Sequence, residues 1–580
     1  MSDAGVTTDP RAALQAIHGK LQRDPKNMAL LRQAAAAHRA LGEREHAERA
    51  EIAALRLSEE VPALQQAAQA MKVREYEEAS RLAADYLAKN PGDLAALALS
   101  AEAAIAIGVS YKAFPLLEQV LGRAPSFMRA RIFYANALML NDRLVEAMRI
   151  ISPMLDRRPD DVELVNLASR IKTELGDHAG AAEANRTLAK LDAKSPDAHA
   201  NLGDALRFAG DKQGSVASYR KALELDPHHG RTWWSLADLD AKAISDDDLS
   251  QIKAALEARK DDPEHAGNLH FALGLVYDKR GEADRAFEHF SAGNGMRKDA
   301  QPYDAQELTD RVDRFLEAMT AERIPALAPA TSDKPTPIFV LGMPRAGSTL
   351  VERMLGRHSQ IEALGELSIA PHMVERIKLD AGEDKLAETI AGLSDEALAN
   401  MGDWYIARAR EHMRSDAAYF VDKLHMNWRH LPLILRMLPQ ARVIDIRRNA
   451  MDCCWSNTKV LFARGHPAAS DLNDIARFYR DYVRQTDTLR NRAPTRIHLQ
   501  SYEALVDDIE QEAQAMFSAM DIPFEPQVID FHLSQEPVAT ASSEQVRKPL
   551  NRKGIGAWTP YAKHLQPLRD ALGDLAGDAA

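Results

Sequence analysis

Apolar residues follow a helical period over the first half of the chain and gather into short runs over the second half. The clearest helical stretch covers residues 197–222, where apolar or small residues line one face of each of two successive predicted helices. These residues are Leu202, Gly203 and Leu206 in the first helix, and Val216, Tyr219 and Ala222 in the second. Residues 95–121, 129–155 and 164–191 carry the same paired pattern. We therefore predict that the first half consists of helix pairs.

Prolines recur through the same region with a nearly constant spacing. They stand at Pro25, Pro62, Pro91, Pro125, Pro159, Pro196, Pro227 and Pro263, with gaps of 37, 29, 34, 34, 37, 31 and 36 residues. A period of about 34 residues built from helix pairs resembles tetratricopeptide repeats. We expect each proline to end the second helix of a pair, where its missing N–H costs least. The sequence thus predicts a tetratricopeptide α-solenoid over residues 10–300, with degenerate outer units.

Repeat arrays of this kind stack into a superhelix with a concave groove. Such grooves commonly hold a peptide or another protein, so a protein or peptide partner is the first expectation for this half. A scaffold for the second half and a homodimer contact are the alternatives.

The second half predicts a different fold class. Residues 322–337 form a proline-rich linker, since four prolines occur there with little periodicity. Beyond it, short apolar runs alternate with helical patterns, which is typical of a parallel α/β sheet. The runs are Ile338–Leu341, Tyr419–Val421, Arg442–Ile446 and Arg496–Leu499. We place this α/β domain at residues 338–570.

Composition excludes several classes of function. The 580-residue chain has a net charge of −12, which argues against a general nucleic-acid binder. Its two cysteines, Cys453 and Cys454, are adjacent, so no disulfide framework is expected and a reducing compartment is indicated. No segment resembles a signal peptide or a membrane span. The histidines that stand close together in the sequence have no accompanying ligand pattern for a metal. We predict a soluble, cytoplasmic protein.

The first apolar run of the α/β domain leads into a candidate phosphate cradle. Residues 337–350 read as a strand, a glycine-punctuated turn and a helix start. Gly342 and Gly347 let the backbone wrap an anion, and Ser348 and Thr349 add hydroxyl donors. Ser348 stands where an ATP- or GTP-binding loop carries lysine, so chemistry other than that of ATP or GTP is indicated.

Basic residues follow the other predicted strands. Because ligands of parallel sheets bind at the carboxyl ends of the strands, these positions are candidates for a site. They include Lys423, Arg448 eight residues before Ser456, and Tyr502. Residues 544–563 add five basic side chains against one acidic one. A ligand with phosphates at two positions is therefore expected.

These motifs resemble those of sulfotransferases that use 3′-phosphoadenosine 5′-phosphosulfate, over roughly residues 335–565. Pro344–Leu350 is similar to the loop that holds the 5′-phosphosulfate, and Arg448–Ser456 to the motif that holds the 3′-phosphate. Arg552–Gly554 resembles the segment that closes over the 3′-phosphate. The resemblance implies a P-loop-like α/β fold, this nucleotide as co-substrate, and no metal.

Four further positions resemble the protein-tyrosine sulfotransferase branch. They are Gly365-Glu366, Lys423, Tyr502 and the stretch Ser542–Asn551. The animal enzymes are anchored in membranes, carry disulfides and lack repeats, and this chain differs in all three respects. A tyrosine acceptor is suggested by the resemblance.

The resemblance also implies a role for each residue. Glu366 would accept the acceptor's proton, Arg345 and Lys423 would stabilise developing charge, and Ser542 would orient the sulfuryl group. The implied donor-binding residues are Arg345, Ala346, Gly347, Ser348, Thr349, Arg448, Ser456, Tyr502, Arg552, Lys553 and Gly554. Arg447 is the alternative to Arg448, although the spacing to Ser456 favours Arg448.

Three other functions stay open at this point. The acceptor could be a small molecule, lipid or glycan, or the chain could be a non-catalytic adaptor that binds nucleotide. A P-loop kinase is the weakest of these alternatives, because the cradle lacks its lysine.

Overall fold

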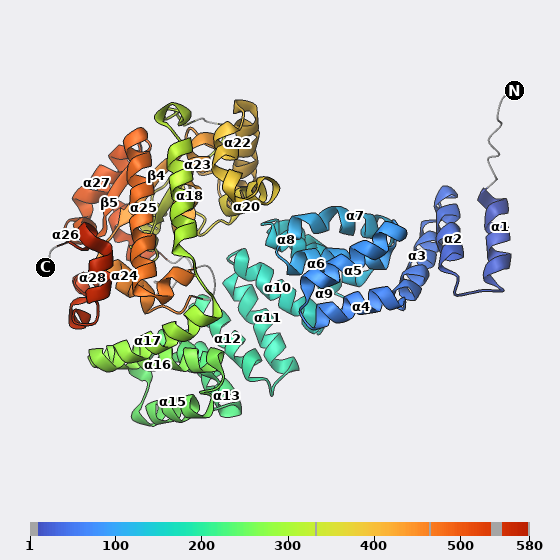
Figure 1. The fold of residues 1–580 in the computed structure, drawn as a ribbon, viewed down its shortest axis with the longest axis horizontal. Coiled ribbons are helices and arrows are strands. Elements are labelled where there is room, and N and C mark those ends of the chain that lie inside the picture. The colour runs from blue at the N-terminus through green and yellow to red at the C-terminus, as the bar shows by residue number, and fades with distance from the viewer. Residues whose placement is uncertain (1–9, 331–332, 463–465, 535–547, 578–580) are drawn as a thin grey trace. The chain divides into compact units, whose positions relative to one another are not determined.

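The computed structural model describes residues 10–330, 333–462, 466–534 and 548–577. The chain divides into two compact units, which meet in the sequence at Leu175 and Gly176. The described part of the first unit is helical, and the second combines further helices with a sheet (Figure 1). The change of fold class after the repeats and the division into compact units therefore fall at different places.

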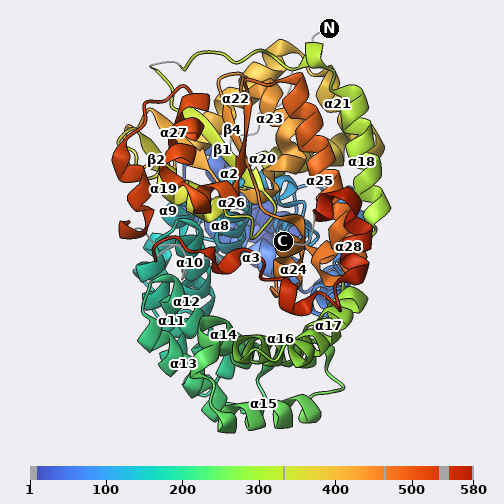
Figure 2. The same cartoon turned by 90° about the vertical axis from the view of Figure 1, so that its left-hand side faces the viewer.

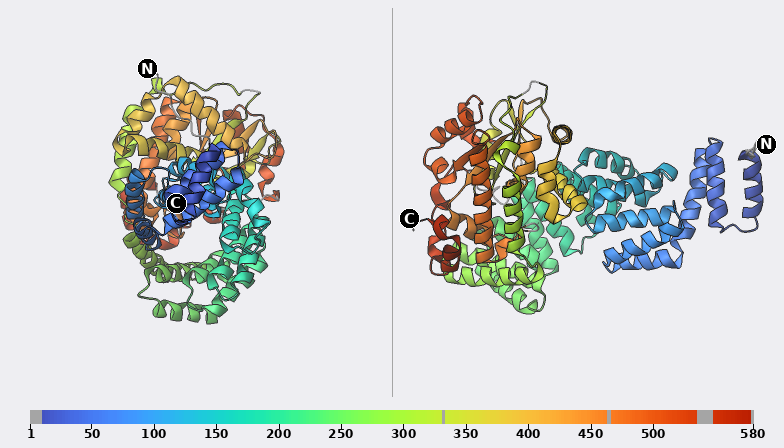
Figure 3. Two further views of the ribbon diagram at one scale, coloured as in Figure 1. Left: turned by 90° about the vertical axis from the view of Figure 1, so that its right-hand side faces the viewer. Right: turned by 45° about the horizontal axis from the view of Figure 1, so that its top comes forward.

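The first unit is built from helices that follow one another as pairs (Figure 3, blue). They are α1 (Pro10–Leu21), α2 (Met28–Ala40), α3 (Arg44–Glu59), α4 (Pro62–Lys72), α5 (Tyr76–Lys89), α6 (Leu94–Ala106), α7 (Ala113–Arg123), α8 (Met128–Leu140), α9 (Leu144–Leu155) and α10 (Val162–Glu174). Alanine and leucine fill much of the core between them. Such small side chains let neighbouring helices pack closely.

The second unit begins with more helices of the same kind. They are α11 (His178–Leu191), α12 (Pro196–Phe208), α13 (Lys212–Leu225), α14 (Gly230–Asp240), α15 (Asp246–Ala258), α16 (Pro263–Arg280), α17 (Ala283–Ala300) and α18 (Ala305–Ala318). Within the α12–α13 pair, a Cβ on Gly203 would lie 2.4 Å from the Tyr219 ring, so only glycine permits this contact. Gly203 and Tyr219 thus lie on the faces of the two helices that the sequence pattern singled out.

The repeat period is regular in the structure. From α2 onward, the first helices of successive pairs begin at Met28, Pro62, Leu94, Met128, Val162, Pro196, Gly230 and Pro263. The predicted helix pairs are confirmed, but the expectation that each proline ends a helix is wrong. Pro62, Pro196 and Pro263 are the first residues of the helices that follow, where proline's fixed φ suits a helix start and its missing N–H is not needed.

A five-stranded parallel sheet forms the core of the α/β domain. Its strands are β1 (Thr336–Gly342), β2 (Ile361–Ala363), β3 (Tyr419–Asp422), β4 (Arg442–Arg447) and β5 (Ile497–Ser501), in the order β2-β3-β1-β4-β5. The four predicted strands are confirmed within two residues at each end. The sequence did not indicate β2, a three-residue strand at the edge of the sheet.

Helices cover both faces of the sheet (Figure 2). Alternate residues of β1 point to opposite faces, as its period of two requires. Ile338 and Val340 pack with α19 (Ser348–Leu355) and α27 (Ile509–Ala519). Phe339 belongs to the other core, with α22 (Asp395–Arg410), α23 (Leu431–Met437) and α25 (Leu472–Arg492), and its ring lies 5.6 Å from that of Tyr405.

The carboxyl ends of the strands gather the residues that the sequence singled out. β1 leads into α19, β3 into the short helix η5 (His425–His430), β4 into α24 (Ala450–Thr458) and β5 into α26 (Tyr502–Asp507). Because all strands are parallel, these connections lie together at the carboxyl ends of the strands. Among the residues that the structure describes, no helix has both the length and the apolar character needed to cross a membrane.

Candidate active site

The loop between β1 and α19 turns through two residues with left-handed backbone. Arg345 has φ +67° and Gly347 has φ +110°. A Cβ on Gly347 would lie 2.7 Å from the Tyr502 ring, so the loop needs glycine both for its turn and for this contact. Ala346, Ser348 and Thr349 complete the loop and are all buried. Loops of this kind place backbone N–H groups around an anion.

Helix α24 holds this loop in place. The Pro344 carbonyl accepts hydrogen bonds from Asn457 Nδ2 at 2.8 Å and from the Cys453 thiol at 3.5 Å. Both side chains are fully buried. Cys453 therefore contributes a loop contact in addition to core packing.

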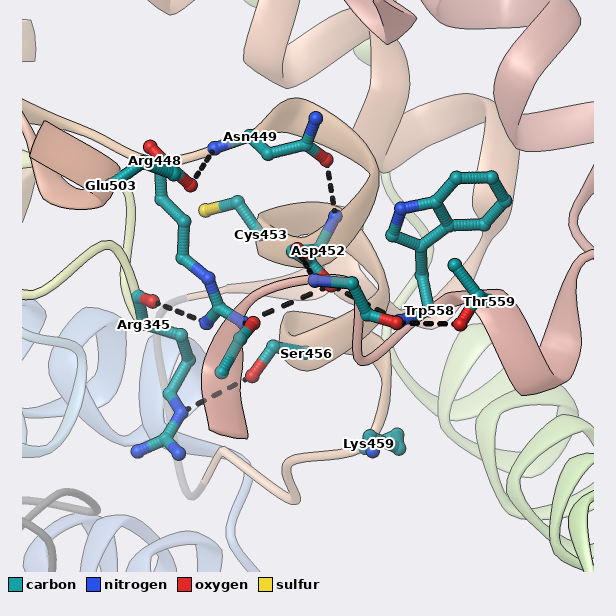
Figure 4. Close-up of polar contacts among 12 residues, drawn as sticks. Arg345, Arg448, Asn449, Asp452, Cys453, Ser456, Lys459, Glu503, Trp558 and Thr559 are labelled. Atoms are coloured by element: carbon teal, nitrogen blue, oxygen red, sulfur yellow. Dashed lines mark hydrogen bonds and ion pairs between the residues drawn. The ribbon is translucent and has the colours of Figure 1, made fainter. Parts of the chain in front are cut away.

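Two arginines meet beside the loop (Figure 4). Arg345 donates from Nε to Ser456 Oγ at 3.4 Å, and Arg448 donates from Nη1 to the Arg345 carbonyl at 3.1 Å. Burial lowers the pKa of Arg345, and the neighbouring charge of Arg448 lowers it further. The Arg448 side chain is only 9% exposed, and its Nε has no hydrogen-bond partner among the described residues. A buried cation with an unused donor favours an anionic ligand.

Tyr502 and Gly554 complete the surroundings of Arg448. The Arg448 guanidinium lies over the Tyr502 ring, with Cζ 5.5 Å from its centroid, and it donates to the Gly554 carbonyl. Asp452 accepts hydrogen bonds from the backbone N–H groups of Gly556 at 2.7 Å and Trp558 at 3.0 Å. The segment that carries Gly554 is thus tied directly to α24.

Arg447 faces a different part of the molecule. Its guanidinium donates to Asp445 Oδ2 at 2.8 Å and to Asp487 Oδ1 at 2.7 Å. Of the two candidates, Arg448 is therefore the one that lies in the loop cluster. Arg552 is 69% exposed and pairs with Asp507, and Lys553 is also exposed, so the structure does not bring these side chains to Arg448.

Glu366 and Lys423 form a second cluster, also at the carboxyl ends of the strands. Lys423 Nζ lies 2.6 Å from Glu366 Oε1 and is 1% exposed. The Lys423 backbone N–H donates to the Gly365 carbonyl at 2.8 Å. This hydrogen bond holds the segment that carries Glu366 against the end of β3. Burial alone would raise the pKa of Glu366, but the Lys423 charge outweighs it and lowers that pKa. Glu366 is therefore held ionised.

Two neighbours shape this second cluster. His425 Nδ1 lies 3.9 Å from Glu366 Oε1, and burial lowers the pKa of His425 to about 4, so this ring is neutral near pH 7. Asp422 accepts from Tyr405 Oη at 2.6 Å and from the Leu424 N–H at 3.1 Å. Burial raises the pKa of Asp422 to about 6 despite these hydrogen bonds.

The last pair of repeat helices packs against α24. The Phe287 ring of α17 lies 5.7 Å from the Trp455 ring, and Asn294 donates to the Thr458 carbonyl at 2.8 Å. At the end of α16, Asp278 lies 3.3 Å from Lys459 Nζ and accepts from Tyr561 Oη. The repeat helices thus contact both α24 and the segment that follows Gly554.

Sequence reasoning missed several residues of these clusters. Asp452 lies four residues after Arg448, and Glu352 lies four residues after Ser348, so a helical spacing from a recognised motif could have indicated both. Asp278 had no local signal, because its partner Lys459 is 181 residues away in the sequence. Ser542 lies outside the described residues.

The described residues fit a nucleotide with phosphates at two positions. A left-handed turn closed by Gly347 and the buried Ser348 and Thr349 provide one cradle. Arg448, which donates to the Gly554 carbonyl and whose Nε has no partner among the described residues, could hold a second anion. Arg345 adds a second buried cation, and the neighbouring charge of Arg448 lowers its pKa.

The same organisation is found in known families. Residues 337–526 match the family model described as sulfotransferase family, and residues 112–171 and 196–229 match two tetratricopeptide repeat models. The chain carries tetratricopeptide repeats followed by a sulfotransferase domain, with distant similarity to protein-tyrosine sulfotransferases.

Individual relatives cover different parts of the chain. An uncharacterized protein of Aquifex aeolicus (strain VF5) is 30% identical over 341 residues, which are 57% of this chain and 44% of that protein. Protein-tyrosine sulfotransferase 1 of Danio rerio is 24% identical over 244 residues, which are 38% of this chain and 65% of that protein. This chain therefore spans less than two thirds of either relative. The solved sulfotransferase domain from the curacin biosynthetic pathway aligns at 17% identity with a TM-score of 0.30, over 42% of this chain and 96% of that domain.

Proposed function

We propose that this protein transfers a sulfuryl group from 3′-phosphoadenosine 5′-phosphosulfate to a hydroxyl acceptor. The observation that carries the proposal is the presence of two clusters at the carboxyl ends of the parallel strands. One is a buried arginine pair with an unused donor, and the other is a carboxylate held ionised by a buried lysine. The first suits a phosphorylated donor, and the second suits removal of a proton from an acceptor.

The donor-binding roles follow from the contacts of each residue. Gly347, Ser348 and Thr349 would surround the 5′-phosphate at the start of α19. Arg448, Ser456 and Gly554 would hold the 3′-phosphate, with Tyr502 packed beneath the guanidinium of Arg448. Charge-assisted hydrogen bonds of this kind are stronger than neutral ones, which favours donors that carry both phosphates.

Arg552 and Lys553 stay candidates for the 3′-phosphate, although Arg552 pairs with Asp507 and both side chains are exposed. The backbone of the same segment, through Gly554, contacts Arg448. Ser542 stays a candidate for orienting the sulfuryl group.

The reaction needs a base on one side and positive charge on the other. The acceptor hydroxyl gives its proton to Glu366, its oxygen bonds to sulfur, and the bond from sulfur to the 5′-phosphate oxygen breaks with its electron pair on that oxygen. Lys423 and Arg345 would stabilise the charge that develops on the transferred group and on the leaving phosphate. General bases contribute on the order of 10²-fold to 10⁴-fold to such reactions.

For the acceptor we propose a tyrosine in a protein or peptide that the repeats present. The similarity to protein-tyrosine sulfotransferases and the repeat array both support this choice. A phenol has an ordinary pKa of about 10, so a base at its oxygen is needed near neutral pH. A small molecule, lipid or glycan acceptor keeps the same chemistry, and a nucleotide-binding adaptor would lack it.

The test uses the full chain, the nucleotide donor labelled with ³⁵S, and a lysate as the source of acceptors. We expect label in protein bands, recovered as tyrosine sulfate after alkaline hydrolysis, and none with Glu366→Gln. Label only in an organic extract would replace the protein acceptor with a small one. Tight binding of adenosine 3′,5′-bisphosphate without transfer to any fraction would favour the adaptor.

A further inference from the structure

A buried carboxylate near the Glu366–Lys423 pair has no part in the chemistry described so far. Glu352 lies in α19, four residues after Ser348, and is only 9% exposed. Its Oε2 lies 3.8 Å from Lys423 Nζ, and the nearby Gly365 backbone N–H lowers the pKa of its carboxyl, against the larger effect of burial. Glu352 therefore joins the helix of the donor loop to Lys423 and to the turn that carries Glu366.

Lys423 is shared between two carboxylates. Glu366 lies 2.6 Å and Glu352 3.8 Å from the same ammonium group. Burial would lower the pKa of Lys423, but the charges of Glu352 and Glu366 outweigh it and raise that pKa. Burial raises the pKa of Glu352, and the nearby Glu366 raises it further while Lys423 opposes both effects.

Other charged groups face the trio from each element around it. Asp422 adds negative charge beside Lys423 at the end of β3, and Arg353 adds positive charge beside Glu352 on α19. His425 faces Glu366 from η5, and burial keeps that ring neutral near pH 7. Lys423 is therefore the buried cation that both carboxylates share.

The charge of the trio changes when a proton arrives. If both carboxylates are ionised and Lys423 is protonated, the three groups sum to −1. When Glu366 takes a proton, the sum is zero, and Lys423 still has Glu352 as its counter-charge. Without Glu352, the same proton uptake would leave the buried ammonium without an ionised partner among these three groups, which costs free energy.

We propose that Glu352 is a positioning residue that keeps Lys423 protonated and in place while Glu366 takes up the acceptor's proton. The proposal rests on the proposed sulfotransfer. Glu352 does not touch the reacting atoms. It acts through Lys423, whose ammonium lies 3.8 Å from its carboxylate.

The first experiment compares wild type with Glu352→Gln by measuring kcat against pH at saturating donor. We expect kcat to fall about tenfold or more. We also expect the acidic limb of the pH–rate profile, set by Glu366, and the basic limb, set by Lys423, both to move to lower pH. The direction of the shift follows from the charge of Glu352. Its negative charge favours the protonated forms of Glu366 and Lys423, so removing that charge lowers the pKa values of both residues. Glu352→Asp keeps the charge, so its limbs should stay near those of wild type.

A matched control comes from the other side of the site. Adenosine 3′,5′-bisphosphate should bind Glu352→Gln as tightly as wild type in calorimetry, because Glu352 is not among the residues proposed to contact either phosphate. Limbs at unchanged pH in Glu352→Gln, with only a lower Tm, would overturn the proposal. If Glu352→Gln does not fold, Glu352→Asp decides the matter, and displaced limbs in that variant would contradict it.

A second readout does not depend on activity. The Tm values of Glu352→Gln, Glu366→Gln and the double variant form a cycle that measures the coupling of the two carboxylates. We expect the double variant to lose more Tm than the sum of the single variants, because only it deprives Lys423 of both carboxylates. Additive losses would refute the sharing of Lys423. Wild type that shows this coupling but no sulfotransfer would refute the proposed function alone.

Discussion

The candidate site has two flanks, one at the carboxyl end of β3 and the other at the carboxyl end of β4. The two flanks are stabilised in different ways. On the β3 flank, Lys423 is matched by carboxylates from the α/β domain itself, with Glu366 at 2.6 Å and Glu352 at 3.8 Å. On the β4 flank, Arg448 has an unused Nε, and α24 is packed against the repeat helices α16 and α17. The β3 flank shares one buried cation between two carboxylates, whereas on the β4 flank Arg448 lies 3.9 Å from Asp452 and keeps one donor, Nε, without a partner among the described residues.

This difference indicates a division of labour. The cluster of Glu352, Glu366 and Lys423 suits the chemical step, because it can accept one proton on Glu366 while Lys423 keeps Glu352 as its counter-charge. An arginine with an unused donor suits ligand binding, because an anion supplies the missing hydrogen bond. Variants of the β3 flank should therefore change turnover, and variants of the β4 flank should change donor affinity.

The largest expected effect is that of Glu366→Gln on turnover. The amide keeps the size of the side chain but cannot take the acceptor's proton, so kcat should fall by about 10²-fold to 10⁴-fold. The affinity for adenosine 3′,5′-bisphosphate should stay within about twofold of wild type. Radiolabel transfer and calorimetry measure the two quantities. A variant that loses nucleotide affinity as strongly as turnover would contradict the separation of the flanks.

The next effect is that of Arg448→Ala on nucleotide binding. Hydrogen bonds to charged groups are worth about 1.5–3 kcal/mol, so the Kd for adenosine 3′,5′-bisphosphate should rise by about tenfold to a hundredfold. Arg448→Lys should recover part of the affinity, since it restores the charge without the fork of donors.

Arg552→Ala is the matched comparison within the same proposed phosphate site. Because Arg552 is 69% exposed and paired with Asp507, we expect its loss to weaken binding by less than that of Arg448. Equal losses for the two variants would show that Arg552 leaves Asp507 when the nucleotide binds. That result would return Arg552 to the role that the sequence resemblance implies.

Much of the fold could be predicted because its signals are local. The repeat period and four strands follow from the spacing of apolar residues and prolines. β2 escaped notice because Ile361–Ala363 holds only three residues at a sheet edge and contains Glu362. Short edge strands are stabilised by their neighbours more than by their own sequence.

The site was predictable only where motifs carried it. Arg345, Glu366, Lys423 and Arg448 stand in recognisable motifs, and the structure places them at one sheet edge. The choice between Arg447 and Arg448 needed the structure, because the buried Asp445 attracts Arg447 away from the loop. Asp278 depends on a tertiary contact, which no local pattern records.

The smallest expected effect is that of Asp278→Asn, which tests whether the repeat helices support the β4 flank. Asp278 pairs with Lys459 just after α24 and accepts from Tyr561 beyond Gly554, so it connects the end of α24 with the segment that follows Gly554. Removing the charge should raise the Kd for adenosine 3′,5′-bisphosphate by about 3-fold to 10-fold and leave kcat at saturating donor unchanged. Calorimetry and initial rates measure these two quantities.

Asp284→Asn provides the control for Asp278→Asn on the neighbouring helix. Asp284 also pairs with the C-terminal segment, through Lys563 at 2.8 Å and His564 at 2.7 Å, but its side chain is 59% exposed. Exposed ion pairs contribute little, so its loss should change the nucleotide Kd by less than about twofold. If Asp278→Asn behaves like Asp284→Asn, the repeat helices pack against the β4 flank without tuning it. Donor affinity would then depend on the α/β domain alone, and the two flanks would be equally self-contained.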